Sequence, residues 1–153
     1  MKKYTVGVNG FEYKDGDNTI VEEILKGDIL EIKRFDCELD GKKVQHLVIK
    51  IQNKEIYELI FKYTTIEARN FMNIMAALNE EQIPCGKNCK IFFLSDRNEN
   101  GKVTNIRLEH EGRHIKWLYP NPPDNEMVNG EYKRDKFWDE VFKDVKGVWC
   151  DKY

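Results

Sequence analysis

The sequence lacks the features that mark several large classes of protein. No apolar run approaches the roughly 20 residues that a membrane-spanning helix needs, and Met1-Lys2-Lys3-Tyr4 does not begin an apolar stretch typical of a secretion signal. Only 4 prolines and 4 cysteines occur among 153 residues, which excludes collagen-like and knottin-like proteins. We therefore expect no membrane segment, reduced cysteines and a cytoplasmic location, in the host cytoplasm if the protein is viral.

A large excess of one charge is also missing. The net charge is −2, from 25 basic and 27 acidic residues, which argues against a histone-like binder. Residues 1–41 carry 6 basic and 10 acidic side chains, whereas residues 83–119 carry 7 and 4. Because salt screens charges beyond about 8–10 Å, the central part can form a local positive groove. Ordinary scatter over a solvated surface explains the same numbers, so both interpretations stay open.

Alternation of apolar and polar residues predicts strands in the first half of the chain. Residues 28–38, 44–52 and 55–63 alternate in this way, and the dipeptides Asp40-Gly41 and Asn53-Lys54 between them are typical of tight turns. These segments predict a three-stranded antiparallel meander.

The remaining strands and the loops are predicted from the same signals. Further strands are expected at residues 2–8, 90–94, 102–109 and 113–119. Residues 11–18 are polar and are expected to form a loop, with a capped turn at 18–25 and a hairpin loop at 96–101.

Helical spacing of apolar residues occurs twice. Between Ile66 and Leu78 the apolar side chains recur every three or four residues, and the Thr64-Thr65 hydroxyls can cap the first turn. A second short helix is predicted at 136–145, beyond the break at Asn121-Pro122-Pro123-Asp124. Its clustered aromatic residues need burial, on this domain or on a partner.

Three strands, a helix and two or three further strands is the element order of the OB-fold, a small Greek-key barrel. In this order and in its aromatic placement, the chain resembles the OB-fold single-stranded DNA-binding proteins, particularly compact bacteriophage members. The resemblance implies a mainly β fold with one central helix. It divides the chain into a strand-and-loop extension (1–26), the barrel (27–119) and a C-terminal arm (120–153). The last residues lack the acidic, Phe-terminated tip of bacterial members.

The resemblance implies sequence-independent binding of single-stranded DNA in replication or recombination, with no catalysis and no cofactor. Such binding needs cations for phosphates and rings on which bases stack. Phe35 lies beside Lys33 and Arg34 and belongs to the same expected interface. The side chains expected to contact phosphates are Lys33, Arg34, Lys50, Lys62, Arg107, Arg113 and Lys116. The rings expected to stack on bases are Tyr57, Trp117 and Tyr119, although Tyr57 shares its strand face with apolar residues and can equally belong to the core. The arm is expected to bind replication proteins or a second copy of the chain.

Other chemistry finds little support in the sequence. Cys85, Cys89, His110 and His114 are a weak candidate zinc set, but the histidines flank a glycine turn and packing explains the cysteines equally well. Ser95 is the only serine and has no neighbouring histidine, so a nucleophilic enzyme is not expected. The alternative function comes from another class: an acidic adaptor or inhibitor module that binds other proteins. It is favoured by the acidic first 41 residues.

Overall fold

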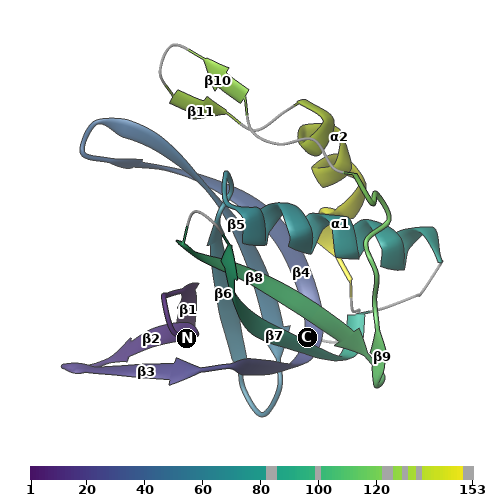
Figure 1. The fold of residues 1–153 in the computed structure, drawn as a ribbon. Coiled ribbons are helices and arrows are strands. Elements are labelled where there is room, and N and C mark those ends of the chain that lie inside the picture. The colour runs from purple at the N-terminus through teal and green to yellow at the C-terminus, as the bar shows by residue number, and fades with distance from the viewer. Residues whose placement is uncertain (82–85, 99–100, 122–125, 129–130, 134–135, 150–153) are drawn as a thin grey trace.

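β-strands form most of the structure (Figure 1). The computed structural model describes the chain except for residues 82–85, 99–100, 122–125, 129–130, 134–135 and 150–153. The elements are β1 (Lys2–Val6), β2 (Phe11–Asp15), β3 (Asn18–Glu22), β4 (Ile24–Leu39), β5 (Lys42–Gln52), β6 (Ile56–Lys62), α1 (Ile66–Glu80), β7 (Gly86–Asn98), β8 (Gly101–His110), β9 (Arg113–His114), β10 (Glu126–Val128), β11 (Glu131–Lys133), α2 (Lys136–Val145) and β12 (Gly147–Val148).

The predicted meander is confirmed as β4, β5 and β6. Asp40 and Gly41 form the turn between β4 and β5 with φ angles of 52° and 77°, the positive values that a two-residue hairpin turn favours. This turn places Phe35 opposite His46 and Lys33 opposite Val48. The distal part of the β4–β5 hairpin, around the Asp40-Gly41 turn, projects from the body of the molecule (Figure 1). We call it the arm hairpin, and it is distinct from the predicted C-terminal arm (120–153).

A single mixed sheet contains 10 strands in the order β3-β2-β1-β6-β5-β4-β7-β8-β9, with β12 also paired to β4. The first part of β4 pairs with β7, and the rest pairs with β5. Gly27 lies at the change of partner, with φ +148°, and a Cβ there would lie 2.4 Å from the backbone oxygen of Gln52. Glycine is therefore required where β4 bends between its two neighbours.

The fold is mainly β, as expected, but the closed barrel is not confirmed. The ladders β4–β5, β5–β6, β4–β7 and β7–β8 are present. The far side of β6 pairs with β1 in parallel, and the far side of β8 pairs with β9. Among the described strands, the two ends of this series therefore do not meet, and the sheet is open.

The N-terminal region corrects the sequence interpretation. Residues 11–18, expected as a loop, and 18–25, expected as a capped turn, form the hairpin of β2 and β3 and the start of β4. Gly16, at φ +64°, lies in the turn between β2 and β3. Phe11 is fully buried, and the otherwise polar hairpin attaches to the sheet through β1. The extension is thus part of the sheet.

Both predicted helices are present. Thr65 caps α1 by accepting a hydrogen bond from the backbone N–H of Ala68, and α2 spans the predicted residues 136–145. Trp138 of α2 is fully buried in the same core cluster as Phe61 and Phe71. The helical part of the predicted arm therefore buries its aromatic side chains on this domain.

Two further expectations concern the region after α1. The strand expected at 113–119 is limited to Arg113–His114, because Asn73 of α1 holds the backbone of Tyr119 through two hydrogen bonds. The expected hairpin loop 96–101 and the proline break 121–124 lie partly outside the described residues. Within the described residues, α1 and α2 are both too short and too polar to cross a membrane.

Candidate nucleic-acid interface

The meander has one face in the core and one face toward solvent, because side chains alternate along each strand. Leu47, Ile49 and Leu59 lie on the inner face and are fully buried. The register places Phe35 of β4, His46 of β5 and Lys62 of β6 in one row on the outer face. We call the outer side of these three strands the outer face.

The row of Phe35, His46 and Lys62 combines exposed rings with positive charge. Phe35 is 58% exposed, an unusual state for a phenylalanine. His46 is half-buried and Lys62 is exposed, and the next row contains Lys33 and Val48. A base can stack on the Phe35 ring while its phosphates lie near the lysine ammonium groups, which is the chemistry of sequence-tolerant strand binding.

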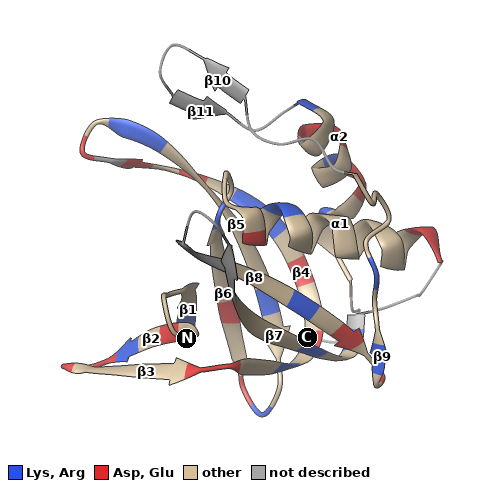
Figure 2. Ribbon diagram, viewed as in Figure 1, with Lys and Arg blue, Asp and Glu red and all other residues tan. Residues whose placement is uncertain are grey.

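Charge changes along the outer face. At the end nearer β12, Lys33 lies 3.8 Å from Glu58 and Lys50 lies 3.5 Å from Glu31, so these charges are balanced. Toward the tip of the arm hairpin, Lys62 forms no ion pair with any described carboxylate. The Phe35 row therefore contains a cation that is unpaired within the described residues, and Figure 2 shows both a basic and an acidic segment near the arm tip.

Arg34 lies on the opposite face from Lys33 and Phe35. Its guanidinium is 3.3 Å from Asp139 of α2, and it lies over the rings of Tyr63 and Phe142 at 5.3 and 5.1 Å. Asp139 also accepts a hydrogen bond from the Tyr63 hydroxyl at 2.8 Å. Burial, together with this hydrogen bond, raises the pKa of Tyr63. Arg34 thus joins α2 to the sheet and does not share the outer face.

The expectation that Tyr57 stacks on a base is wrong. Tyr57 is 7% exposed, faces the core with Leu59 and Phe61, and donates a hydrogen bond to the backbone oxygen of Lys26 at 2.7 Å. Its burial raises the pKa of the hydroxyl. An inward ring of this kind is unavailable to a base.

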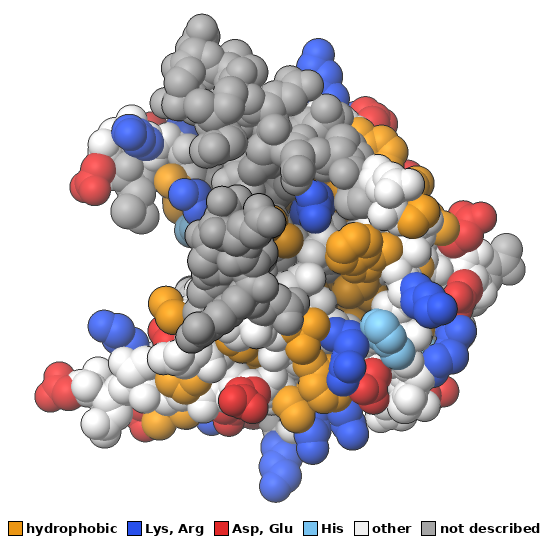
Figure 3. All heavy atoms as spheres, viewed as in Figure 1, with side chains coloured by type: hydrophobic (Ala, Val, Ile, Leu, Met, Phe, Trp, Pro, Cys, Tyr) orange, Lys and Arg blue, Asp and Glu red, His pale blue; other side chains and the backbone are white. Residues whose placement is uncertain are grey.

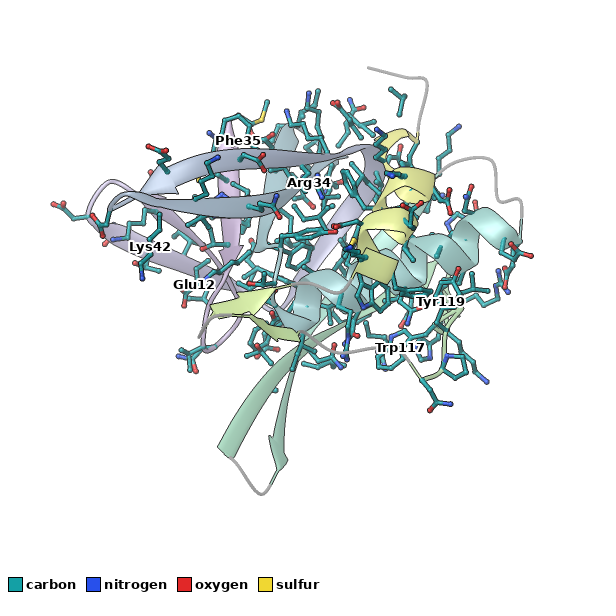
Figure 4. All side chains as sticks on the ribbon, turned by 90° about the horizontal axis from the view of Figure 1, so that it is seen from above. Glu12, Arg34, Phe35, Lys42, Trp117 and Tyr119 are labelled. Carbon is teal, nitrogen blue, oxygen red and sulfur yellow. The ribbon has the colours of Figure 1, made fainter. Side chains whose placement is uncertain are left out.

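The other predicted residues lie elsewhere. Figure 4 shows Trp117 and Tyr119 beside α1, on a different side of the molecule from Phe35. Arg107 of β8 stacks on Phe92 of β7 at 4.5 Å and lies 3.4 Å from Glu109. The predicted residues therefore do not form one continuous surface.

Trp117 lines a shallow groove at the end of α1 with charges of both signs. Arg113 lies 2.6 Å from Glu81, and Glu80 and Lys116 also line the groove. Trp117 is 36% exposed. Because the carboxylates of α1 balance the cations, this groove is a weaker site for a polyanion than the Phe35 row.

Tyr119 has a structural role in the described contacts. The Asn73 side chain donates to the Tyr119 backbone oxygen at 2.9 Å and accepts from its backbone N–H at 2.8 Å. The Tyr119 ring packs edge-on against Phe137 and Trp138. These contacts connect α1 to α2.

The candidate zinc set does not come together. Cys85 lies outside the described residues. Cys89 and His110 are directly opposite each other, with Sγ and Nδ1 3.9 Å apart. His114 is opposite Glu109, the neighbour of His110, so it points to the other face of the sheet. No group of three or more metal-ligating residues occurs within the described part of the chain. Burial raises the pKa of Cys89 to about 12, so this thiol is a poor nucleophile.

Sequence reasoning omitted His46 from the interface. The two-residue turn at Asp40-Gly41 was the available signal, because counting outward from it pairs position 35 with position 46. Comparison of the chain with protein-family models, curated proteins and solved structures finds no match. The geometry of the outer face is therefore the basis for assigning a function.

Proposed function

We propose that this protein binds single-stranded DNA without sequence specificity, in replication or recombination, and that it has no catalytic activity. The binding surface is the outer face of β4, β5 and β6. Bases stack on Phe35 and His46, and Lys62 contacts phosphates.

The exposed Phe35 ring, in one row with His46 and Lys62, carries this proposal. A large apolar ring on a strand loses about 1.5–3 kcal/mol of burial free energy when it stays in water. Stacking of a base on an aromatic side chain contributes about 1–3 kcal/mol, which can offset the cost of exposing the ring. An exposed ring close to a cation is therefore typical of a nucleic-acid-binding surface. An adaptor that mimics a nucleic acid needs carboxylates at this position, where the row contains Phe35, His46 and Lys62.

The order of the strands also supports the proposal. The series β6-β5-β4-β7-β8, with α1 between β6 and β7, is the strand order of an OB-fold with one seam left open. We propose that the fold is such an open variant. In OB-folds, oligonucleotides bind along the second and third strands and between the loops that follow the first and fourth strands. Here these loops are the arm hairpin and the β7–β8 hairpin.

Fluorescence anisotropy of a labelled oligothymidine tests the proposal, at low and high salt. Saturable binding that weakens as salt rises is expected, because bound lysines release counterions. The Phe35→Ala variant should bind about 5- to 150-fold more weakly, which corresponds to the loss of one stacked base. Phe35→Trp should retain binding.

Trp117→Ala is the matched control, because it removes an exposed ring from the charge-balanced groove. It should bind like the wild type. Absence of saturable binding at low salt would refute the proposed function and favour the protein-binding alternative. Equal loss in both variants would show that Phe35 is not the stacking residue.

A further inference from the structure

The outer face continues beyond the meander onto the N-terminal strands. β1 pairs in parallel with β6, so Thr5 lies beside Ile60 and Lys3 lies beside Glu58. The next ladder places Thr5 opposite Glu12 of β2. Together with the pairs Lys33–Val48 and Val48–Ile60 of the meander, these pairs form one row of side chains from β4 to β2. At about 4.8 Å between strands, the distance from β4 to β2 is about 19 Å.

A hollow lies beside β1 and β2, and Thr19 of β3 also lines it. Its volume is about 760 Å³. Lys3, Thr5, Lys14 and Thr19 line it from positions on the outer face. Lys2 and Tyr13 line it from positions on the opposite face. In Figures 1 and 3 the arm hairpin and the β2–β3 hairpin project on the same side of the molecule. The sheet order places β6 and β1 between these two projections.

Three carboxylates line the hollow together with the lysines, and one of them is in an ion pair. Glu55 forms an ion pair with Lys2 at 2.9 Å, and this contact lowers the pKa of Glu55. Glu12 lies opposite Thr5 in the row that crosses the outer face. Asp15, the third, lies at the end of β2.

Within the described residues, Lys3 and Lys14 form no ion pair. Two ammonium groups thus lie near threonine hydroxyls in an open hollow. This is a suitable environment for phosphate oxygens, which accept hydrogen bonds from both kinds of group.

We propose that the N-terminal hairpin is a second phosphate-binding subsite for the same polynucleotide. The strand leaves the Phe35 row, crosses β6 and β1, and places further phosphates beside Lys3 and Lys14. This inference rests on the proposed function. It predicts that the binding site is longer than the outer face of the meander alone.

Anisotropy with labelled oligothymidines of 4 and 16 nucleotides, at several salt concentrations, tests the subsite. The Lys3→Gln/Lys14→Gln variant should bind the 16-mer roughly tenfold more weakly at low salt. Its log-log salt slope should be smaller by about 1.4, since each lost phosphate contact on a single strand changes the slope by about 0.7. Binding of the 4-mer, which can occupy the Phe35 row alone, should be unchanged.

The matched control is Lys26→Gln/Lys90→Gln, which removes two exposed lysines that face each other on β4 and β7. It should leave affinity and slope for the 16-mer unchanged. If the wild type binds the 16-mer and the hairpin variant keeps the same affinity and slope, the subsite is refuted while the proposed function stands. If the wild type does not bind at low salt, both are refuted.

Discussion

Replacement of Trp138 by alanine tests whether α2 belongs to the folded core. Trp138 is fully buried, and its ring centroid lies 5.1 Å from that of Phe137 and 6.5 Å from that of Tyr119. Truncation of a buried aromatic residue costs about 3–5 kcal/mol, from lost burial and from the cavity that remains. For a chain of this size each kcal/mol lowers Tm by about 2–4 °C, so the expected decrease is roughly 6–20 °C.

Thermal unfolding followed by circular dichroism measures this decrease, and urea unfolding gives the change in free energy. Glu140→Ala is the control on the same helix. Glu140 is exposed and its pair with Lys143 is a surface pair, so the change should stay below about 0.5 kcal/mol. A decrease in Tm of less than about 2 °C for Trp138→Ala would refute the placement of α2 in the core. Such a decrease is much smaller than the loss of one buried ring should cause.

Three further predictions concern the backbone and the buried titratable groups. Gly27→Ala should lower the free energy of unfolding by more than about 2 kcal/mol, because its Cβ meets the Gln52 backbone and its φ is positive; a chemical-denaturation midpoint equal to the wild type would contradict this. Because burial raises the pKa of Cys89 to about 12, iodoacetamide at pH 8 should leave Cys89 unmodified in the native protein and modify it in urea, as peptide mass mapping can measure. Burial also raises the pKa values of Tyr57 and Tyr63, so these groups hold their protons longer in the folded state than in the unfolded state, where they titrate near pH 10. The raised pKa of Cys89 has the same effect from about pH 9, near the ordinary pKa of an unfolded cysteine. The free energy of unfolding should therefore fall as pH rises from about 9 through 10 and above. A urea midpoint that stays constant from pH 8 to 11 would exclude this linkage.

Local patterns predicted the elements whose signals lie within a few residues. Asp40-Gly41 fixed the hairpin because two consecutive positive φ angles suit Asp and Gly. The spacing of Phe71, Ile74 and Leu78 identified α1, because a helix places these residues on one side. Tyr57 and Leu59 are two positions apart on a strand, so their side chains lie on the same face, and the apolar Leu59 indicates that this face is the core.

Pairings between distant segments were not predictable from local patterns. The parallel β1–β6 ladder joins residues more than 50 positions apart, and no turn sequence encodes it. The hairpin of β2 and β3 is too polar to show a clear alternation of apolar and polar residues. It is held in place by the buried Phe11 and by pairing with β1, which local patterns do not reveal.

Two details of the site were also hidden for this reason. Arg34 and Lys33 are adjacent, so they must point to opposite faces of β4, but the partner of Arg34 on α2 lies 105 residues later. The segment after His114 alternates like a strand, yet Asn73 determines its path. In both cases a distant polar side chain decides the local geometry.

The sheet uses residues from both ends of the chain. Gly147 and Val148 pair with Ile32 and Glu31, and the Trp149 backbone N–H donates to Leu30 at 2.8 Å. During synthesis, β4 therefore leaves the ribosome long before its last neighbour exists. At about 5–20 residues per second, the interval is roughly 6–23 seconds. For that time one edge of the nascent sheet is open to other chains, so chaperone binding during translation should matter more for this protein than for one that folds from local contacts.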